Sequence, residues 1–293
     1  MSAGVTESVA AGTLYIVATP IGNLGDLSPR AREVLAHVQL IAAEDTRHTR
    51  QLLQAFGIAT ALTSLHEHNE IHKSEALIAR LVAGESLALV SDAGTPLISD
   101  PGFDLVIAAR ARGVPVVAVP GPCAAIAALS VAGLPTDRFV FEGFLPAKIA
   151  ARVSRLRELV NEERTMIFYE APHRLPEVLR DLAAEFGADR TASVSRELTK
   201  RFETNYHGTL AQLADQASRD ADMSRGEIVI VVSGREPVAA LSQQTLNAEQ
   251  VLRALLEDLP PSQAAKIAAR ITGEKRSDLY ARAVQLAGDQ KQS

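Results

Sequence analysis

The chain has 293 residues, of which 47% are hydrophobic and 22% charged, as in an ordinary globular protein. A net charge of −5 argues against a protein that neutralises many nucleic-acid phosphates by itself, so RNA contacts would depend on local basic patches. The single cysteine excludes an intrachain disulfide and a cysteine-rich metal site. No apolar run approaches the roughly 20 residues of a membrane span, and residues 1–12 lack the regions of a secretory signal. We therefore expect a flexible tail at 1–12 and a cytoplasmic protein without a membrane partner.

Five strand–helix repeats are predicted in the first part of the chain. Short aliphatic or β-branched runs indicate strands at 13–19, 39–43, 63–65, 87–90 and 115–119. Helical patterns follow at 29–37, 50–56, 73–83 and 103–112, and an alanine-rich helix follows Cys123. Ser28 and Pro29 are expected to be the N-cap and first residue of the first helix. The alternation predicts an α/β fold with a parallel, doubly wound sheet over residues 13–133.

Each of these strands ends in a polar or Gly/Pro loop, with the sequences PIGN, EDTR, HEHN, SDAGTP and PGPC. Because the carboxyl ends of parallel strands share one edge of a sheet, the five loops predict a ligand-binding rim. The loop richest in glycine and proline is VSDAGTPLISDPG, from Val90 to Gly102. Taken alone, this loop fits a plain strand-to-helix turn equally well.

The pattern changes after Gly133. Strands at 139–143, 165–170, 191–196, 203–208 and 227–233 outnumber helices at 152–161, 175–186 and 210–216. This predicts a second α/β domain with a mixed sheet over residues 134–234, followed by a polar linker at 235–247. Residues 248–288 read as a module of three helices, with Ser262 as a cap and a turn at Gly273, in helix-turn-helix outline. A packing or dimerisation module fits this nearly neutral segment as well as a nucleic-acid reader does.

Charged side chains in the loops are the candidates for binding a phosphate-bearing substrate. They are Arg47, Arg50, His173, Arg174, Arg196 and Lys200. The alternatives are a solvated helix start for the first pair and a salt-bridge network between domains or subunits for the others.

Several common catalytic motifs are absent from the sequence. PIGNLGD is not a phosphate-binding P-loop, and no G-x-S-x-G nucleophile elbow occurs. His66, His68 and His72 have a spacing that resembles a metal site, but no third ligand type supports it. We therefore expect no metal, and we interpret Cys123 as a compact packing residue.

Seven motifs stand out in the loops: ATPIGNLGDLSPRA, AEDTRHT, SDAGTPLISDPG, VPGPCAAIAALSVAGLPT, FEGFLP, FYEAPHR and SRELTK. Taken together, they resemble the tetrapyrrole methylase superfamily of S-adenosylmethionine-dependent enzymes. Within the superfamily, the sequence is similar to the RsmI family of small-subunit ribosomal RNA ribose methyltransferases. The segment LPPSQAAKIAARITGEKRSDLY resembles the helical tail of that family.

The resemblance implies two α/β domains with S-adenosylmethionine in the cleft between them, and a homodimer. It implies methyl transfer to the ribose 2′-hydroxyl of a cytidine in 16S ribosomal RNA, as RNA or as the assembled small subunit. It places cofactor contacts at Pro20, Ala93, Gly94, Thr95, Ile98, Cys123, Ala124, Glu170 and Leu198. Members that act on tetrapyrroles commonly carry Gly-Gly-Asp at positions 93–95 and Thr-Ala at 123–124. These differences argue against a tetrapyrrole substrate.

A ribose hydroxyl is a weak acid, so a base or a pKa-lowering cation would assist the transfer. The candidates are Asp45, Glu67, Asp100, Glu170 and Lys200, and the sequence does not choose among them. Two other functions remain open: a methylase of a small-molecule ring or modified amino acid, and a metabolite-sensing regulator whose helical tail binds DNA.

Overall fold

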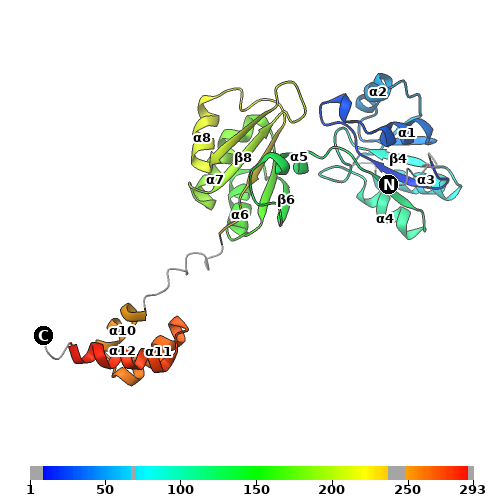
Figure 1. Ribbon diagram of the computed structural model, residues 1–293. Helices are drawn as coiled ribbons and strands as arrows, with labels where there is room; N and C mark the ends of the chain where they lie inside the picture. The colour runs from blue at the N-terminus through cyan, green and yellow to red at the C-terminus, as the bar shows by residue number, and fades with distance from the viewer. Residues whose placement is uncertain (1–8, 67–69, 237–247, 290–293) are drawn as a thin grey trace. The chain divides into compact units, whose positions relative to one another are not determined.

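A computed structural model describes residues 9–66, 70–236 and 248–289 (Figure 1). The chain divides into two compact units, Met1–Gly234 and Arg235–Ser293. Among the described residues, no helix combines the length and apolar character that crossing a membrane requires. Within the predicted tail, residues 1–8 lie outside the described part. Gly12 is hydrogen-bonded from its backbone nitrogen to the carbonyl oxygen of Gly84 at 3.0 Å.

The first sheet has five parallel strands, as predicted. They are β1 (Leu14–Val17), β2 (Leu40–Ala43), β3 (Leu62–Ser64), β4 (Leu87–Val90) and β5 (Val116–Val119), in the order β3-β2-β4-β1-β5. All four residues of β2 and of β4 are buried, which is typical of parallel strands covered on both faces. Because the strands are parallel, the carboxyl ends of all five meet at one edge of the sheet.

The helices of this part follow the strands closely. They are η1 (Leu24–Asp26), α1 (Pro29–His37), α2 (Thr46–Ala55), α3 (Glu70–Val82), α4 (Phe103–Ala111) and α5 (Ala124–Val131). The predicted cap is confirmed, since the Ser28 side chain accepts a hydrogen bond from the Ala31 backbone nitrogen. The predicted start of α2 at Arg50 was wrong. The helix begins at Thr46 because the Asp45 carboxylate caps it by accepting from the Arg47 nitrogen.

The second sheet is mixed, as predicted. Its strands are β6 (Phe139–Phe144), β7 (Thr165–Glu170), β8 (Thr191–Arg196), β9 (Thr204–Thr209) and β10 (Ile228–Val232), in the order β6-β7-β10-β8-β9. Only β6 and β7 pair in parallel among the described strands of this sheet. The accompanying helices are α6 (Ile149–Leu159), η2 (Pro172–Arg174), α7 (Leu175–Phe186) and α8 (Leu210–Arg219).

Helix α5 connects the two sheets. It lies next to the second sheet in Figure 1, and its buried residues Ala125, Ala128 and Leu129 share a hydrophobic cluster with β7 and β10. Ile21, from the loop after β1, belongs to the same cluster. This shared core holds the segments on either side of α5. The domain boundary near residue 134 stays a prediction.

The second unit contains three helices in its described part. They are α10 (Ala248–Leu256), α11 (Pro261–Thr272) and α12 (Arg276–Asp289), packed around small residues such as Ala264, Ala265 and Ala268. Gly273 ends α11 with φ 74°, in agreement with the predicted turn. The predicted cap at Ser262 was wrong: Pro260 is the N-cap, because Pro261 already has the backbone angle of a first helical residue. Most of the predicted linker, 237–247, lies outside the described residues.

Candidate functional site

Three loops at the carboxyl edge of the first sheet are joined by hydrogen bonds. The backbone nitrogen of Thr19 donates to the Gly94 carbonyl at 2.9 Å, and the Gly94 nitrogen returns a bond to Thr19 at 3.1 Å. The hydroxyl of Thr95 donates to the Pro122 carbonyl at 2.9 Å. The loops after β1, β4 and β5, three of the five loops predicted to form the rim, are therefore joined to one another at this edge.

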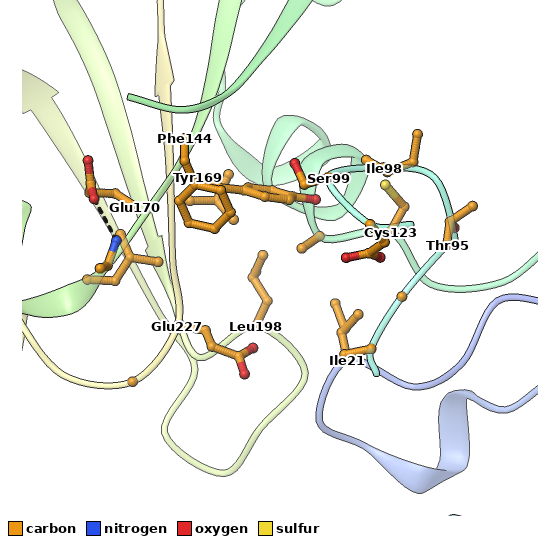
Figure 2. Close-up of a pocket in the computed structure, with 18 of the residues that line it drawn as sticks. Ile21, Thr95, Ile98, Ser99, Cys123, Phe144, Tyr169, Glu170, Leu198 and Glu227 are labelled. Carbon is orange, nitrogen blue, oxygen red and sulfur yellow. Dashed lines mark hydrogen bonds between the residues drawn. The ribbon is translucent and has the colours of Figure 1, made fainter. Parts of the chain in front are cut away.

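A cavity of about 340 Å³ opens at this edge (Figure 2). From the three loops it is lined by Ile21, Ala93, Gly94, Thr95, Ile98, Ser99, Asp100, Cys123 and Ala124. From the second sheet and its loops it is lined by Phe144, Tyr169, Glu170, Ala171, Pro172, Leu198, Gly226, Glu227, Ile228 and Val229. A mostly apolar cavity with a few polar groups is typical of a small-molecule or cofactor site.

Most of the predicted cofactor contacts lie together in this cavity. All of them line it except Pro20, which lies in a neighbouring hollow while the adjacent Ile21 faces the cavity. The sequence interpretation missed Phe144, Tyr169 and residues 226–229. Tyr169 and Phe144 stand in the centre of Figure 2, between Glu170 and the loop that carries Ile98.

Tyr169 fixes one wall of the cavity. Its hydroxyl accepts a hydrogen bond from the Ala125 nitrogen at 3.1 Å, so β7 holds the start of α5. Its ring makes edge contacts with Phe141 and Phe144, at centroid distances of 4.9 and 5.6 Å. Burial raises the pKa of Tyr169 above its usual range, which keeps the phenol neutral.

Two cavity residues are flanked by unusual backbone conformations. Leu97 and Ser99, on either side of Ile98, have φ values of 73° and 69°. Glu197 and Thr199, on either side of Leu198, have φ values of 53° and 66°. Such angles cost non-glycine residues about 1–3 kcal/mol each and persist where surrounding structure imposes them, most often at functional sites. Both Ile98 and Leu198 line the cavity, so the strained backbone lies in the cavity wall.

Among the predicted candidate bases, Asp100 is a cavity residue whose pKa is raised to a value near neutral pH. It lines the cavity, and burial raises its pKa to about 6, although a hydrogen bond with Ser91 opposes the rise. The nearby carboxylates of Glu44 and Asp92 raise the pKa further. A carboxyl group that titrates near neutral pH in a cavity is a candidate for proton transfer.

The other candidate carboxylates that the structure describes, Asp45 and Glu170, also have protein partners. Asp45 faces Arg47 at 2.6 Å, and this hydrogen-bonded pair holds the pKa of the carboxyl well below its usual range. The buried carboxylate of Glu170 turns toward the Ala171 nitrogen, from which it accepts at 2.7 Å (Figure 2). Burial raises the pKa of Glu170, against the effects of this bond and of Arg174. Glu67, like His68, lies outside the described residues.

Three of the predicted substrate-binding cations make internal bonds. Arg174 donates to the carbonyls of Leu145 and Pro146, and Arg196 donates to those of Arg225 and Phe202. The third cation, Lys200, is bonded to two carboxylates.

Lys200 lies next to the cavity lining rather than in it. Its ammonium contacts the carboxylates of Glu197 at 2.9 Å and Glu227 at 3.2 Å. Its stem lies against Gly22, where an added Cβ would clash with Lys200 Cγ. Lys200 therefore links the β1 loop to the wall that carries Leu198.

The remaining predicted cations are at the surface. Arg50 and His173 are exposed, and the Arg47 side chain is 85% exposed despite its contact with Asp45. The part of the chain described here holds no group of three His, Cys, Asp or Glu side chains arranged to bind a metal ion.

Comparisons with known proteins agree with the motifs. Residues 13–214 match the family model of tetrapyrrole (corrin/porphyrin) methylases, and residues 242–287 match that of the RsmI C-terminal HTH domain. The chain is 60% identical over 269 residues to the ribosomal RNA small subunit methyltransferase I of Xylella fastidiosa strain Temecula1, covering 92% of this chain and 98% of the relative. It is 55% identical to the protein of the same name from Pseudomonas aeruginosa, covering 96% of this chain and 99% of the relative.

Solved structures agree on the fold. The uroporphyrin III C-methyl transferase of Thermus thermophilus, complexed with S-adenyl homocysteine, aligns over 75% of this chain and 97% of its own. The TM-score is 0.52 at 17% sequence identity. The chain therefore belongs to the tetrapyrrole methylase family and, within it, to the ribosomal RNA small subunit methyltransferase I proteins.

Proposed function

We propose that the protein transfers a methyl group from S-adenosylmethionine to the ribose 2′-hydroxyl of a cytidine in small-subunit (16S) ribosomal RNA. The observation that carries this proposal is the 340 Å³ cavity, which the motif loops of the family build together. The high identity to ribosomal RNA small subunit methyltransferases I, over nearly the whole chain, supports the RNA substrate.

The cavity fits this cofactor. Ile98 and Leu198 offer apolar surface for a planar ring, and the loop of Ala93, Gly94 and Thr95 brings backbone groups close to the ligand. S-adenosylhomocysteine bound to the Thermus thermophilus relative supports the same class of ligand. When bound, S-adenosylmethionine supplies an activated methyl group, so the chain has to orient the acceptor oxygen and take its proton.

A methylase of a small-molecule ring or modified amino acid is the second candidate, favoured only by the shared fold. The residues at 93–95 and 123–124 differ from the pattern common in tetrapyrrole-specific members, which supports the RNA substrate instead. We also propose a homodimer and a cytoplasmic location, following the family resemblance.

Transfer of a labelled methyl group to RNA tests the proposed substrate class. Purified protein and methyl-labelled S-adenosylmethionine are incubated with small ribosomal subunits from cells that lack the enzyme. We expect label in the small-subunit RNA and none in a uroporphyrin or peptide acceptor. Label on either of those acceptors alone would contradict the RNA substrate.

We propose Asp100 as the group that accepts the hydroxyl proton. Because its pKa is about 6, the carboxylate form, and with it kcat/KM for RNA, should rise with pH through 6 and level off above 7. Asp100→Asn should lower kcat about 10²–10⁴-fold and abolish this rise. Full activity of the variant with an unchanged pH profile would remove Asp100 from this role.

Asp100→Asn should lower activity but raise the stability of the folded protein. The stability measurement therefore serves as the control for folding. A carboxyl whose pKa is raised on folding binds more protons in the folded state than in the unfolded state. The wild-type protein therefore loses stability as the pH rises from 3.8 to about 6. Asp100→Asn lacks this buried charge. We therefore expect its melting temperature to exceed that of the wild type at pH 8 and the difference to shrink as the pH falls toward 4.

A further inference from the structure

A second hollow lies beside the cofactor cavity, at the same edge of the first sheet. It has a volume of about 310 Å³ and is lined by Pro20, Gly22, Leu24, His48, Gln51, Leu52, Ala55 and Asp92. Residues that are adjacent in the chain line different spaces. Ile21 lines the cavity, whereas its neighbours Pro20 and Gly22 line the hollow. Ala93 lines the cavity, whereas the preceding Asp92 lines the hollow. The two spaces therefore share walls made by the loops after β1 and β4.

One face of α2 forms much of this hollow. His48, Gln51, Leu52 and Ala55 are spaced i, i+3, i+4 and i+7, which places them on the same side of a helix. The Asp45 cap that starts α2 also donates its backbone nitrogen to Asp92 Oδ1 at 2.9 Å. The helix and the Asp92 carboxylate are therefore fixed relative to each other before any ligand binds.

The chemistry of the hollow suits an unstacked nucleobase. Leu24, which is 51% exposed, and Leu52 supply apolar surface for the faces of a ring. His48 and Gln51 are exposed, and within the described part of the chain their side chains make no hydrogen bond. Single-stranded RNA is typically read in this way, through an unstacked base that is stacked and hydrogen-bonded along its edge.

The carboxylate of Asp92 adds a preference for an amine. Its Oδ1 is occupied by the Asp45 nitrogen, and no donor among the described residues reaches Oδ2. A carboxylate accepts a hydrogen bond from the exocyclic amine of cytosine, and the Gln51 amide can both donate and accept along the same edge.

We propose that this hollow binds the base of the nucleotide that is methylated, with its amine edge at Asp92 and Gln51. The inference rests on the proposed RNA substrate and adds where the acceptor nucleotide sits. A base held here leaves its ribose beside the loops after β1 and β4, which also line the cofactor cavity, and the acceptor oxygen has to be aligned with the methyl group there. Arg50 lies elsewhere: it lines a different hollow together with Gln54.

A filling variant with a matched control tests the inference. Ala55→Met adds volume to the hollow from an exposed helix position. Gln54→Met introduces the same side chain at the neighbouring exposed position, which lies outside the hollow. We expect Ala55→Met to lower kcat/KM for small subunits at least tenfold and Gln54→Met to leave it within twofold. Both variants should keep the wild-type affinity for S-adenosylhomocysteine and the wild-type melting temperature.

A second pair removes a polar group instead of adding bulk. Gln51→Ala should lower kcat/KM about 5- to 20-fold through KM, whereas Gln54→Ala should have no effect. Wild-type kinetics of both Ala55→Met and Gln51→Ala would overturn the base site and leave the proposed function standing. If the wild-type protein itself transfers no methyl group to RNA, the proposed function fails, and the base site fails with it.

Discussion

A Gly94→Val variant is expected to lose at least about 100-fold in affinity for S-adenosylhomocysteine while remaining folded. Gly94 has φ 84°, and a Cβ there would lie 3.3 Å from Ile21 Cγ2. Both residues line the cavity, so a branched side chain must displace the wall or break the paired bonds with Thr19. The affinity is measured by titration calorimetry.

Gly113 supplies the control for backbone strain alone. It has φ 70° at the end of α4, with nothing within 4 Å of an added Cβ. Gly113→Val should cost about 1–2 kcal/mol of stability through its left-handed backbone, yet leave the affinity for S-adenosylhomocysteine unchanged. Equal affinities of the two variants would show that the cavity is not the cofactor site.

A Glu70→Ala variant is expected to lose about 2–3 kcal/mol of unfolding free energy. Glu70 Oε1 accepts from the backbone nitrogens of Gly102, Asp104 and Leu105, at 3.1, 2.8 and 3.3 Å. Gly102 is the N-cap of α4 and has no side chain to offer, so Glu70 caps this helix from α3. Hydrogen bonds to a buried charged group contribute about 1.5–3 kcal/mol.

The effect should extend from stability to ligand binding. Glu70 holds the end of the loop that carries Ile98 and Asp100 into the cavity, so cofactor affinity should fall as well. Glu75→Ala, at an exposed position of the same helix, should change neither quantity. Urea unfolding and calorimetry measure the two effects, and a Glu70→Ala protein as stable as Glu75→Ala would rule out the capping role.

Much of the fold followed from local patterns in the sequence. The short aliphatic strands, each followed by a turn-rich loop, predicted the parallel first sheet, and eight of the nine residues that the family resemblance gave as cofactor contacts line the cavity. Ser28 could be recognised as a cap because it immediately precedes a proline and a helical pattern. Asp45 stands in the same relation to α2, but without a proline it gave a weaker signal.

Long-range pairing explains most of what the sequence did not predict. Tyr169 faces the cavity because β7 packs against α5, whose residues are 44 positions away in the chain. Glu70 caps a helix 32 or more residues further on. Arg174 and Arg196 resemble substrate-binding residues in sequence, yet their guanidinium groups hold backbone carbonyls. No local pattern distinguishes a cation that binds a carbonyl from one that binds a phosphate.

Identification of the methylated atom tests the central proposal most directly. Small subunits treated with the protein and labelled S-adenosylmethionine are digested to nucleosides, which are separated and analysed by mass spectrometry. The proposed function predicts a single labelled product, 2′-O-methylcytidine. A labelled base-methylated nucleoside, or RNA without label, would contradict it.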